Sequence, residues 1–207
     1  MIRGNETANH AMAVPNPPVA AFLVAASLLQ EGGDLEGEIA VLGRAVEIEP
    51  DHGETRRRLA AALSRAGRTG EAEQQYQRAV YIEPGFWLNN YYLGELYSSR
   101  GRYDAAVIQA RQVVVLAPLF VGGYSNLGVL YSYMGRDDLA RETFERSLEE
   151  DAVDNYAAFA NLGHLYDNEH RYADAAAMFE RALTVTDSDY RVWGNLGWSL
   201  NFSRGPA

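Results

Sequence analysis

Residues 126–131 read NLGVLY, and residues 161–166 read NLGHLY. The same Asn-Leu-Gly triplet returns a third time at residues 195–197. The leucine, the glycine and the tyrosine of this segment lie one, two and five residues after the asparagine, which brings them onto neighbouring rows of one helical face. The nearly constant interval between Asn126, Asn161 and Asn195 predicts one helical unit used several times along the chain.

Punctuating residues follow the same period on both sides of this segment. Pro50, Pro84 and Pro118 are equally spaced, and each would end a helix because proline cannot donate a backbone hydrogen bond. A glycine series steps by the same interval, and glycine suits the left-handed conformation that closes a helix. Two helices joined by a glycine turn therefore make up each unit. The glycines are Gly33, Gly67, Gly101 and Gly135.

The pattern of leucine, Gly/Ala, tyrosine, alanine and proline at these spacings resembles the tetratricopeptide repeat family, whose helix–turn–helix unit has about 34 residues. The resemblance implies an all-α fold, a right-handed superhelical α-solenoid in which neighbouring repeats cover one another's apolar faces. Glu38 departs from the pattern, since it stands where the family has a small residue. The expected organisation is a flexible leader or linker at 1–18, an array at 19–203 with repeats at 19–52, 53–86, 87–120, 121–154 and 156–189 and the first helix of a sixth at 190–203, and a tail at 204–207.

Composition excludes several classes of function. The 207 residues carry 28 acids against 18 bases, a formal charge of −10, which argues against nucleic-acid binding. The chain lacks cysteine and lysine, so thiolate metal sites and a P-loop are impossible, and no apolar run is long enough to span a membrane. His164 and His170, six residues apart, do not form a metal pair. We expect the protein to have no enzymatic activity and to bind no cofactor or metal. We expect its location to be cytoplasmic or periplasmic.

The first helix of each repeat is expected to line a peptide-binding groove. In repeats of the resembled family its sixth position faces the groove, and here that position holds asparagine in three successive repeats. A carboxamide can pair with both polar groups of a ligand backbone, so the asparagines would form a ladder along an extended peptide. The alternative is that they support the neighbouring helix. The residues expected to contact a peptide are Leu88, Tyr91, Tyr92, Glu95, Ser125, Asn126, Tyr133, Asn161, His164, Asn195 and Trp198.

Other tyrosines, at the fourth and eleventh repeat positions, are assigned to the core instead. They are Tyr97, Tyr124, Tyr131 and Tyr166.

The groove lacks the residues that bind one known class of ligand. The family's clamp for the acidic tails of Hsp70 and Hsp90 needs basic residues and asparagines at set positions of three repeats. Arg57 fits the first position, but Ala61, Tyr92, Gly122 and Asn126 do not fit the rest. An Hsp70/Hsp90 tail adaptor is therefore not expected.

The segment 190–203 is unusual for the last helix of such an array, because it carries Trp193, Trp198 and Phe202 where a polar face is common. We interpret the chain as a segment of a longer bacterial protein, and we attribute its exclusive use of arginine as the basic residue to the codon bias of a GC-rich genome. A homo-oligomer formed through residues 190–203 is an alternative. A third reading makes the segment the recruiting arm of a larger kinase, cyclase or glycosyltransferase.

Overall fold

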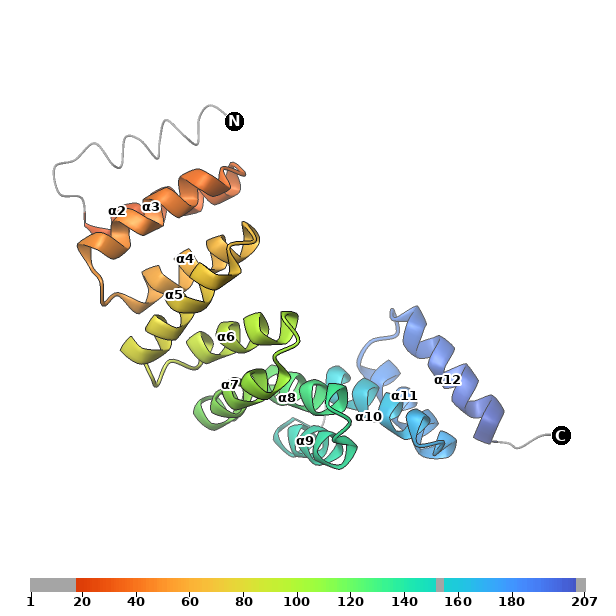
Figure 1. Ribbon diagram of the computed structural model, residues 1–207. Coiled ribbons are helices and arrows are strands. Elements are labelled where there is room, and N and C mark those ends of the chain that lie inside the picture. The colour runs from red at the N-terminus through yellow and green to blue at the C-terminus, as the bar shows by residue number, and fades with distance from the viewer. Residues whose placement is uncertain (1–17, 152–154, 204–207) are drawn as a thin grey trace. The chain divides into compact units, whose positions relative to one another are not determined.

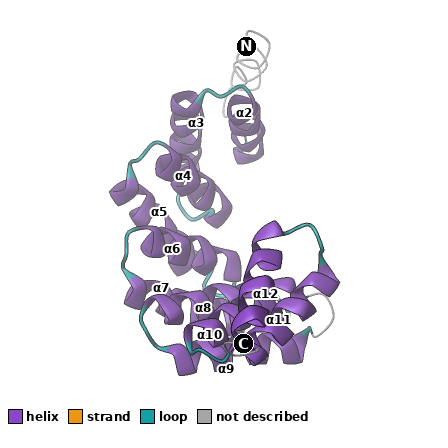
Figure 2. Ribbon diagram, turned by 90° about the vertical axis from the view of Figure 1, so that its right-hand side faces the viewer, coloured by secondary structure: helices purple, strands orange, loops and turns teal. Residues whose placement is uncertain are grey.

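The computed structural model describes residues 18–151 and 155–203, and within those ranges it contains eleven α-helices and no strand (Figure 2). This confirms the all-α prediction. The chain divides after Arg100 into two compact units, which are described separately. The division falls between the two helices of the predicted repeat 87–120.

Unit 1 consists of two helix pairs and one further helix (Figure 1). Phe22 is fully buried and packs with Val19 and Ala45. The first two helices therefore pack through a large aromatic side chain on one and a small alanine on the other. The helices of unit 1 are α2 (Val19–Glu31), α3 (Leu35–Ile48), α4 (Gly53–Arg65), α5 (Thr69–Ile82) and α6 (Trp87–Ser99).

Unit 2 contains six helices, and its core includes a cluster around the fully buried Phe179. Phe179 packs with Phe159, Ala175 and Val192, side chains from three different helices. The helices of unit 2 are α7 (Tyr103–Leu116), α8 (Val121–Tyr133), α9 (Asp137–Glu150), α10 (Tyr156–Asn168), α11 (Tyr172–Val185) and α12 (Tyr190–Ser203).

The turns between paired helices share one backbone conformation. The glycines at 33, 67, 101 and 135 all have positive φ, between 66° and 76°. In the fifth turn the same place is taken by His170, with φ of 60°. In several of these turns, the residue that follows the positive-φ residue donates its N–H to the carbonyl five residues earlier, as Arg136 does to Tyr131 at 2.9 Å. The pattern of glycines therefore marks helix ends through their backbone freedom.

Close helix packing explains the glycines of the NLG segments. A Cβ built on Gly163 would lie 2.6 Å from Cε1 of Phe179, and one on Gly128 would overlap the ring of Phe144. Gly197 has no atom within 4 Å of the same position. The glycines on α8 and α10 are thus required by an aromatic ring on the partner helix, whereas the one on α12 meets open space.

The tyrosines assigned to the core lie where expected. Tyr97, Tyr124 and Tyr131 are buried, with at most 8% of each residue exposed. Tyr166 is half-buried against the core cluster of unit 2, and the guanidinium of Arg171 lies 4.2 Å from its ring centre.

Candidate functional site

A polar cavity of about 530 Å³ lies between α10 and α12 of unit 2. It gathers three of the residues predicted to contact a peptide, namely Asn161, His164 and Asn195. The cavity is open to solvent, and its lining mixes carboxamide, imidazole, charged and apolar side chains. It is lined by Tyr156, Ala157, Ala160, Asn161, His164, Asp189, Arg191, Val192 and Asn195.

A second cavity, of about 370 Å³, adjoins the first on the other side of α10. Asn161 and His164 line both, so the two cavities meet at these side chains. Tyr133 of α8 lines the second cavity and stacks on Tyr103 with ring centres 5.6 Å apart. One cavity lies between α8 and α10 and the other between α10 and α12, and they adjoin at Asn161. We call the two cavities together the groove of unit 2.

The carboxamide of Asn161 has no hydrogen-bond partner among the described residues. The side chain is half-buried between the two cavities. The position from which a neighbouring repeat could reach it holds Val129, which cannot hydrogen-bond. One donor group and one acceptor oxygen therefore remain available to a ligand.

Asn195 differs from Asn161 because it faces a polar neighbour. Its Nδ2 lies 3.5 Å from Nε2 of His164, at the outer limit of a hydrogen bond. In unit 1 the corresponding residue, Arg58, bonds to the hydroxyl of Ser27 at 2.7 Å. At these two places the sixth residue of a repeat thus contacts the first helix of the repeat before it.

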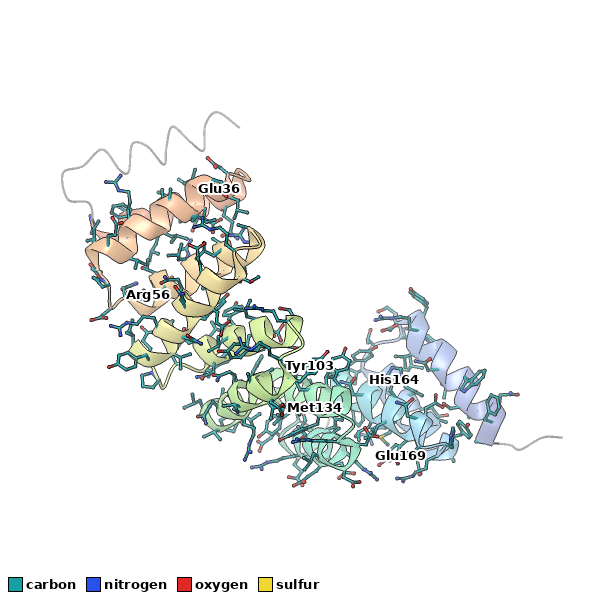
Figure 3. The ribbon with its side chains drawn as sticks, in the orientation of Figure 1. Glu36, Arg56, Tyr103, Met134, His164 and Glu169 are labelled. Atoms are coloured by element: carbon teal, nitrogen blue, oxygen red, sulfur yellow. The ribbon has the colours of Figure 1, made fainter. Side chains whose placement is uncertain are left out.

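His164 lies between the two cavities, and Figure 3 labels it on α10. Its ring meets the edge of Phe179 at 5.2 Å with an interplanar angle of 75°. Partial burial lowers the pKa of His164 below its ordinary value, while Asp167 opposes the shift. The lowered pKa favours the neutral imidazole, which offers the groove one donor and one acceptor.

One end of the first cavity is charged. The hydroxyl of Tyr156 donates to Oδ2 of Asp189 at 2.5 Å, and Arg191 forms an ion pair with the same carboxylate at 3.3 Å. Burial and the bond to Asp189 raise the pKa of Tyr156 to about 12, and the hydrogen bond from Tyr156 lowers the pKa of Asp189. Neither Tyr156 nor Asp189 was among the predicted site residues, because they stand at the two ends of the repeat.

The remaining predicted residues of unit 2 lie outside the first cavity. Ser125 and Asn126 are half-buried on α8. Trp198 is 56% exposed on α12 and packs against Phe202, with ring centres 4.4 Å apart. Trp198 therefore belongs to the exposed face of α12 and does not join Asn161 and Asn195.

The predicted residues of unit 1 all lie on α6. Tyr92 stacks on Tyr76 of α5 at 6.1 Å, and Tyr91 meets Tyr92 edge-on at 5.6 Å. Leu88 is half-buried, and Glu95 is exposed. This helix presents an aromatic surface in which Tyr92 serves partly as packing for the helix pair before it.

Two features are absent from the described ranges. Within residues 18–151 and 155–203, no group of three or more His, Asp or Glu side chains could hold a metal ion. No helix in the same ranges is long and apolar enough to cross a membrane. The chemistry that the groove offers is hydrogen bonding and apolar contact.

Comparison with known sequences decides the family. Two sequence profiles, both described as tetratricopeptide repeat, match residues 121–154 and 158–189. The chain is a tetratricopeptide repeat protein. No curated protein matches this tetratricopeptide repeat sequence with significance.

Solved tetratricopeptide repeat structures share the fold at low identity. MamA from Desulfovibrio magneticus RS-1 aligns with a TM-score of 0.73 at 17% identity, covering 86% of this chain and 99% of that one. YrrB, described as having an unusual peptide-binding site, gives 0.69 at 17% identity and 98% of both chains. A tetratricopeptide repeat protein from Parabacteroides merdae gives 0.77 at 16%, covering 89% and 73%. These matches confirm the helical-repeat solenoid.

Proposed function

We propose that this tetratricopeptide repeat protein is a non-enzymatic interaction scaffold that binds an extended peptide, or an extended segment of a partner protein, in the groove of unit 2. The carboxamide of Asn161 carries the proposal, since it is free at the point where two cavities meet. A half-buried amide without a protein partner gains a hydrogen bond when a peptide backbone replaces water beside it.

The shape of the groove supports a peptide rather than a compact small molecule. The two cavities adjoin across α10 and together follow the direction from α8 to α12. An extended chain advances about 3.3 Å per residue, so several residues would be needed to cross both hollows. YrrB, which shares the fold, is described as a tetratricopeptide repeat protein with a peptide-binding site.

The test begins with selection of a binder from a random peptide library on the purified chain, followed by calorimetric titration of the selected peptide. Asn161→Ala should weaken binding by roughly threefold to tenfold, because one or two hydrogen bonds to the ligand backbone are lost. Asn126→Ala combined with Asn161→Ala should weaken it at least as much. Asn201→Ala, an exposed asparagine of α12 outside both cavities, is the matched control.

The ligand provides the second arm of the test. Replacing one amide of the peptide by an ester should reproduce the loss seen with Asn161→Ala, and should have little further effect in that variant. Unchanged affinity in Asn161→Ala would reject the groove as the binding site.

A second candidate is self-association through α12. Trp193, Trp198 and Phe202 are 52%, 56% and 42% exposed, and Gly197 has open space above it. A second copy of the chain is the occupant proposed for this face. Light scattering should then report a dimer or larger species that Trp198→Glu converts to monomer, and a monomeric parent chain would refute it.

A further inference from the structure

Three arginine side chains of unit 2 have no interaction partner in the part of the chain that the structure describes. The guanidinium groups of Arg111, Arg136 and Arg146 make no ion pair, hydrogen bond or ring contact with any residue in those ranges. Every other arginine described has such an interaction, for example Arg141 with Glu169 at 3.0 Å. The three side chains are exposed, so together they form a positively charged patch on a chain of net charge −10.

The three arginines line one cavity of about 390 Å³. The cavity lies between α7 and α9, with α8 as its floor, and Glu142 is the one acidic residue among those that line it. Its other walls are largely apolar, so it combines a cationic rim with an apolar interior. It is lined by Val107, Arg111, Val114, Tyr124, Leu127, Tyr131, Arg136, Leu139, Glu142, Thr143 and Arg146.

A buried hydroxyl in the same cavity also lacks a partner among the described residues. Tyr124 is 1% exposed, and its Oη is buried without any hydrogen bond. A buried polar group left unpaired is costly, and buried hydroxyls of proteins are nearly always satisfied. Tyr124 therefore has a hydrogen bond to give, and this observation is separate from the arginines because Tyr124 lies at the floor of the cavity and they lie at its rim.

The cavity does not belong to the groove of unit 2. At about 100° per residue, Tyr124, Leu127 and Tyr131 lie on one side of α8, while Val129 and Tyr133, which line the groove, lie on the other. A ligand in this cavity would therefore contact the opposite side of α8 from a peptide in the groove.

We propose that this cavity is a second binding site, which takes an acidic peptide segment whose carboxylates flank a bulky apolar side chain. Guanidinium groups stay charged and pair best with carboxylates, and three of them call for more than one anionic group. The apolar walls call for an aliphatic or aromatic side chain, which a free inorganic anion lacks. The hydroxyl of Tyr124 is covered in this structure, so a carboxylate oxygen accepts its proton only after the side chains above it move aside.

The direct test is fluorescence anisotropy with a labelled peptide that has aspartates on both sides of a central Leu-Phe pair. Two matched peptides replace the aspartates by asparagines or the Leu-Phe pair by two serines. The acidic apolar peptide should bind roughly tenfold or more tightly than either, with affinity that falls as salt rises. Equal binding of all three peptides, or displacement by inorganic phosphate with no advantage for the Leu-Phe pair, would overturn the proposal.

Variants of the chain locate the site. Changing Arg111, Arg136 and Arg146 together to glutamine should weaken binding roughly tenfold or more. The control triple variant changes Arg68, Arg78 and Arg171 to glutamine; these are exposed and lie outside the cavity, and the net charge changes by the same amount. Equal losses in the two triple variants would reduce the effect to overall charge and reject the site.

Tyr124→Phe separates ligand binding from folding. It should weaken binding by about threefold to tenfold, because the ligand loses one hydrogen bond. It should not lower the melting temperature, because no described residue of the folded chain bonds to the hydroxyl. Unchanged affinity with this variant would contradict the placement of the carboxylate at the floor, and with it the proposal.

Discussion

Arg65 of α4 holds the carboxylate of Glu38 of α3, with Nη2 lying 2.7 Å from Oε1 and 2.6 Å from Oε2. Glu38 is 2% exposed, so its charge is buried and this guanidinium is the base that pairs with it. An acid at a position where the resembled repeats carry a small residue is thus tolerated through a partner from the next repeat.

Removing Arg65 should therefore lower the free energy of unfolding more than removing Glu38. Arg65→Ala should lower the free energy of unfolding by about 1–3 kcal/mol, because it leaves a buried carboxylate unpaired. Glu38→Ala should cost less, and the double variant should be more stable than Arg65→Ala alone. Chemical denaturation of the three variants measures this, and additive losses in the double variant would disprove the coupling.

Two glycines with the same sequence context should respond in opposite ways to alanine. Gly163→Ala should lower stability by about 1–3 kcal/mol, since the new Cβ would lie 2.6 Å from the fully buried ring of Phe179. Gly197→Ala should raise it by about 0.5–1 kcal/mol, since alanine favours the helix and meets no neighbour. Thermal melts compare the two directly, and destabilisation by Gly197→Ala would show that its face is occupied in solution.

The fifth turn can be improved by restoring glycine. His170 has φ of 60°, where the conformation costs a residue with a Cβ roughly 1–2 kcal/mol. His170→Gly should raise the free energy of unfolding by up to about 1 kcal/mol, less what is lost with the exposed contact to Tyr172. Gly135→Ala, at φ of 66°, is the reciprocal control and should destabilise. Equal melting temperatures for the parent chain and His170→Gly would show that the turn carries no strain.

Stability should depend on pH through His164. Its pKa in the folded chain is lowered by partial burial, so below the unfolded value of about 6.5 the unfolded chain binds more protons. The free energy of unfolding should be fully present above that pH and should fall as the pH drops toward the lowered pKa. His164→Gln should flatten this part of the profile, and NMR titration of the imidazole should report the lowered pKa itself. A profile that His164→Gln leaves unchanged would assign the pH dependence to other groups.

Much of the fold follows from local pattern. The NLG segments predicted helices whose Leu, Gly and Tyr share a face, and Tyr124, Tyr131 and Leu127 are buried on α8. The periodic glycines predicted the turns because positive φ is a property of single residues. His170 could not be found in this way, because histidine, unlike glycine, does not favour a positive φ.

The candidate site was less predictable, because hydrogen-bond partners come from other repeats. The period placed Asn161 and Asn195 at equivalent positions, yet of these two only Asn195 faces a polar side chain, that of His164. Tyr92 was expected in a groove, and its ring stacks on Tyr76. The sequence pattern specifies which face a residue lies on, and the neighbouring helix specifies what meets it there.

The helical-repeat architecture follows from the sequence alone, since the constant period, the helix-ending prolines and the turn glycines act through local backbone chemistry. Which polar groups remain unpaired depends on how the helices pack. Arg111, Arg136 and Arg146 are separated in the sequence and resemble any surface arginines until the packing of α7, α8 and α9 places them in the lining of one cavity. The physical reason is that a charge is satisfied or left free by what packs beside it, and packing in a repeat array joins residues about one repeat apart.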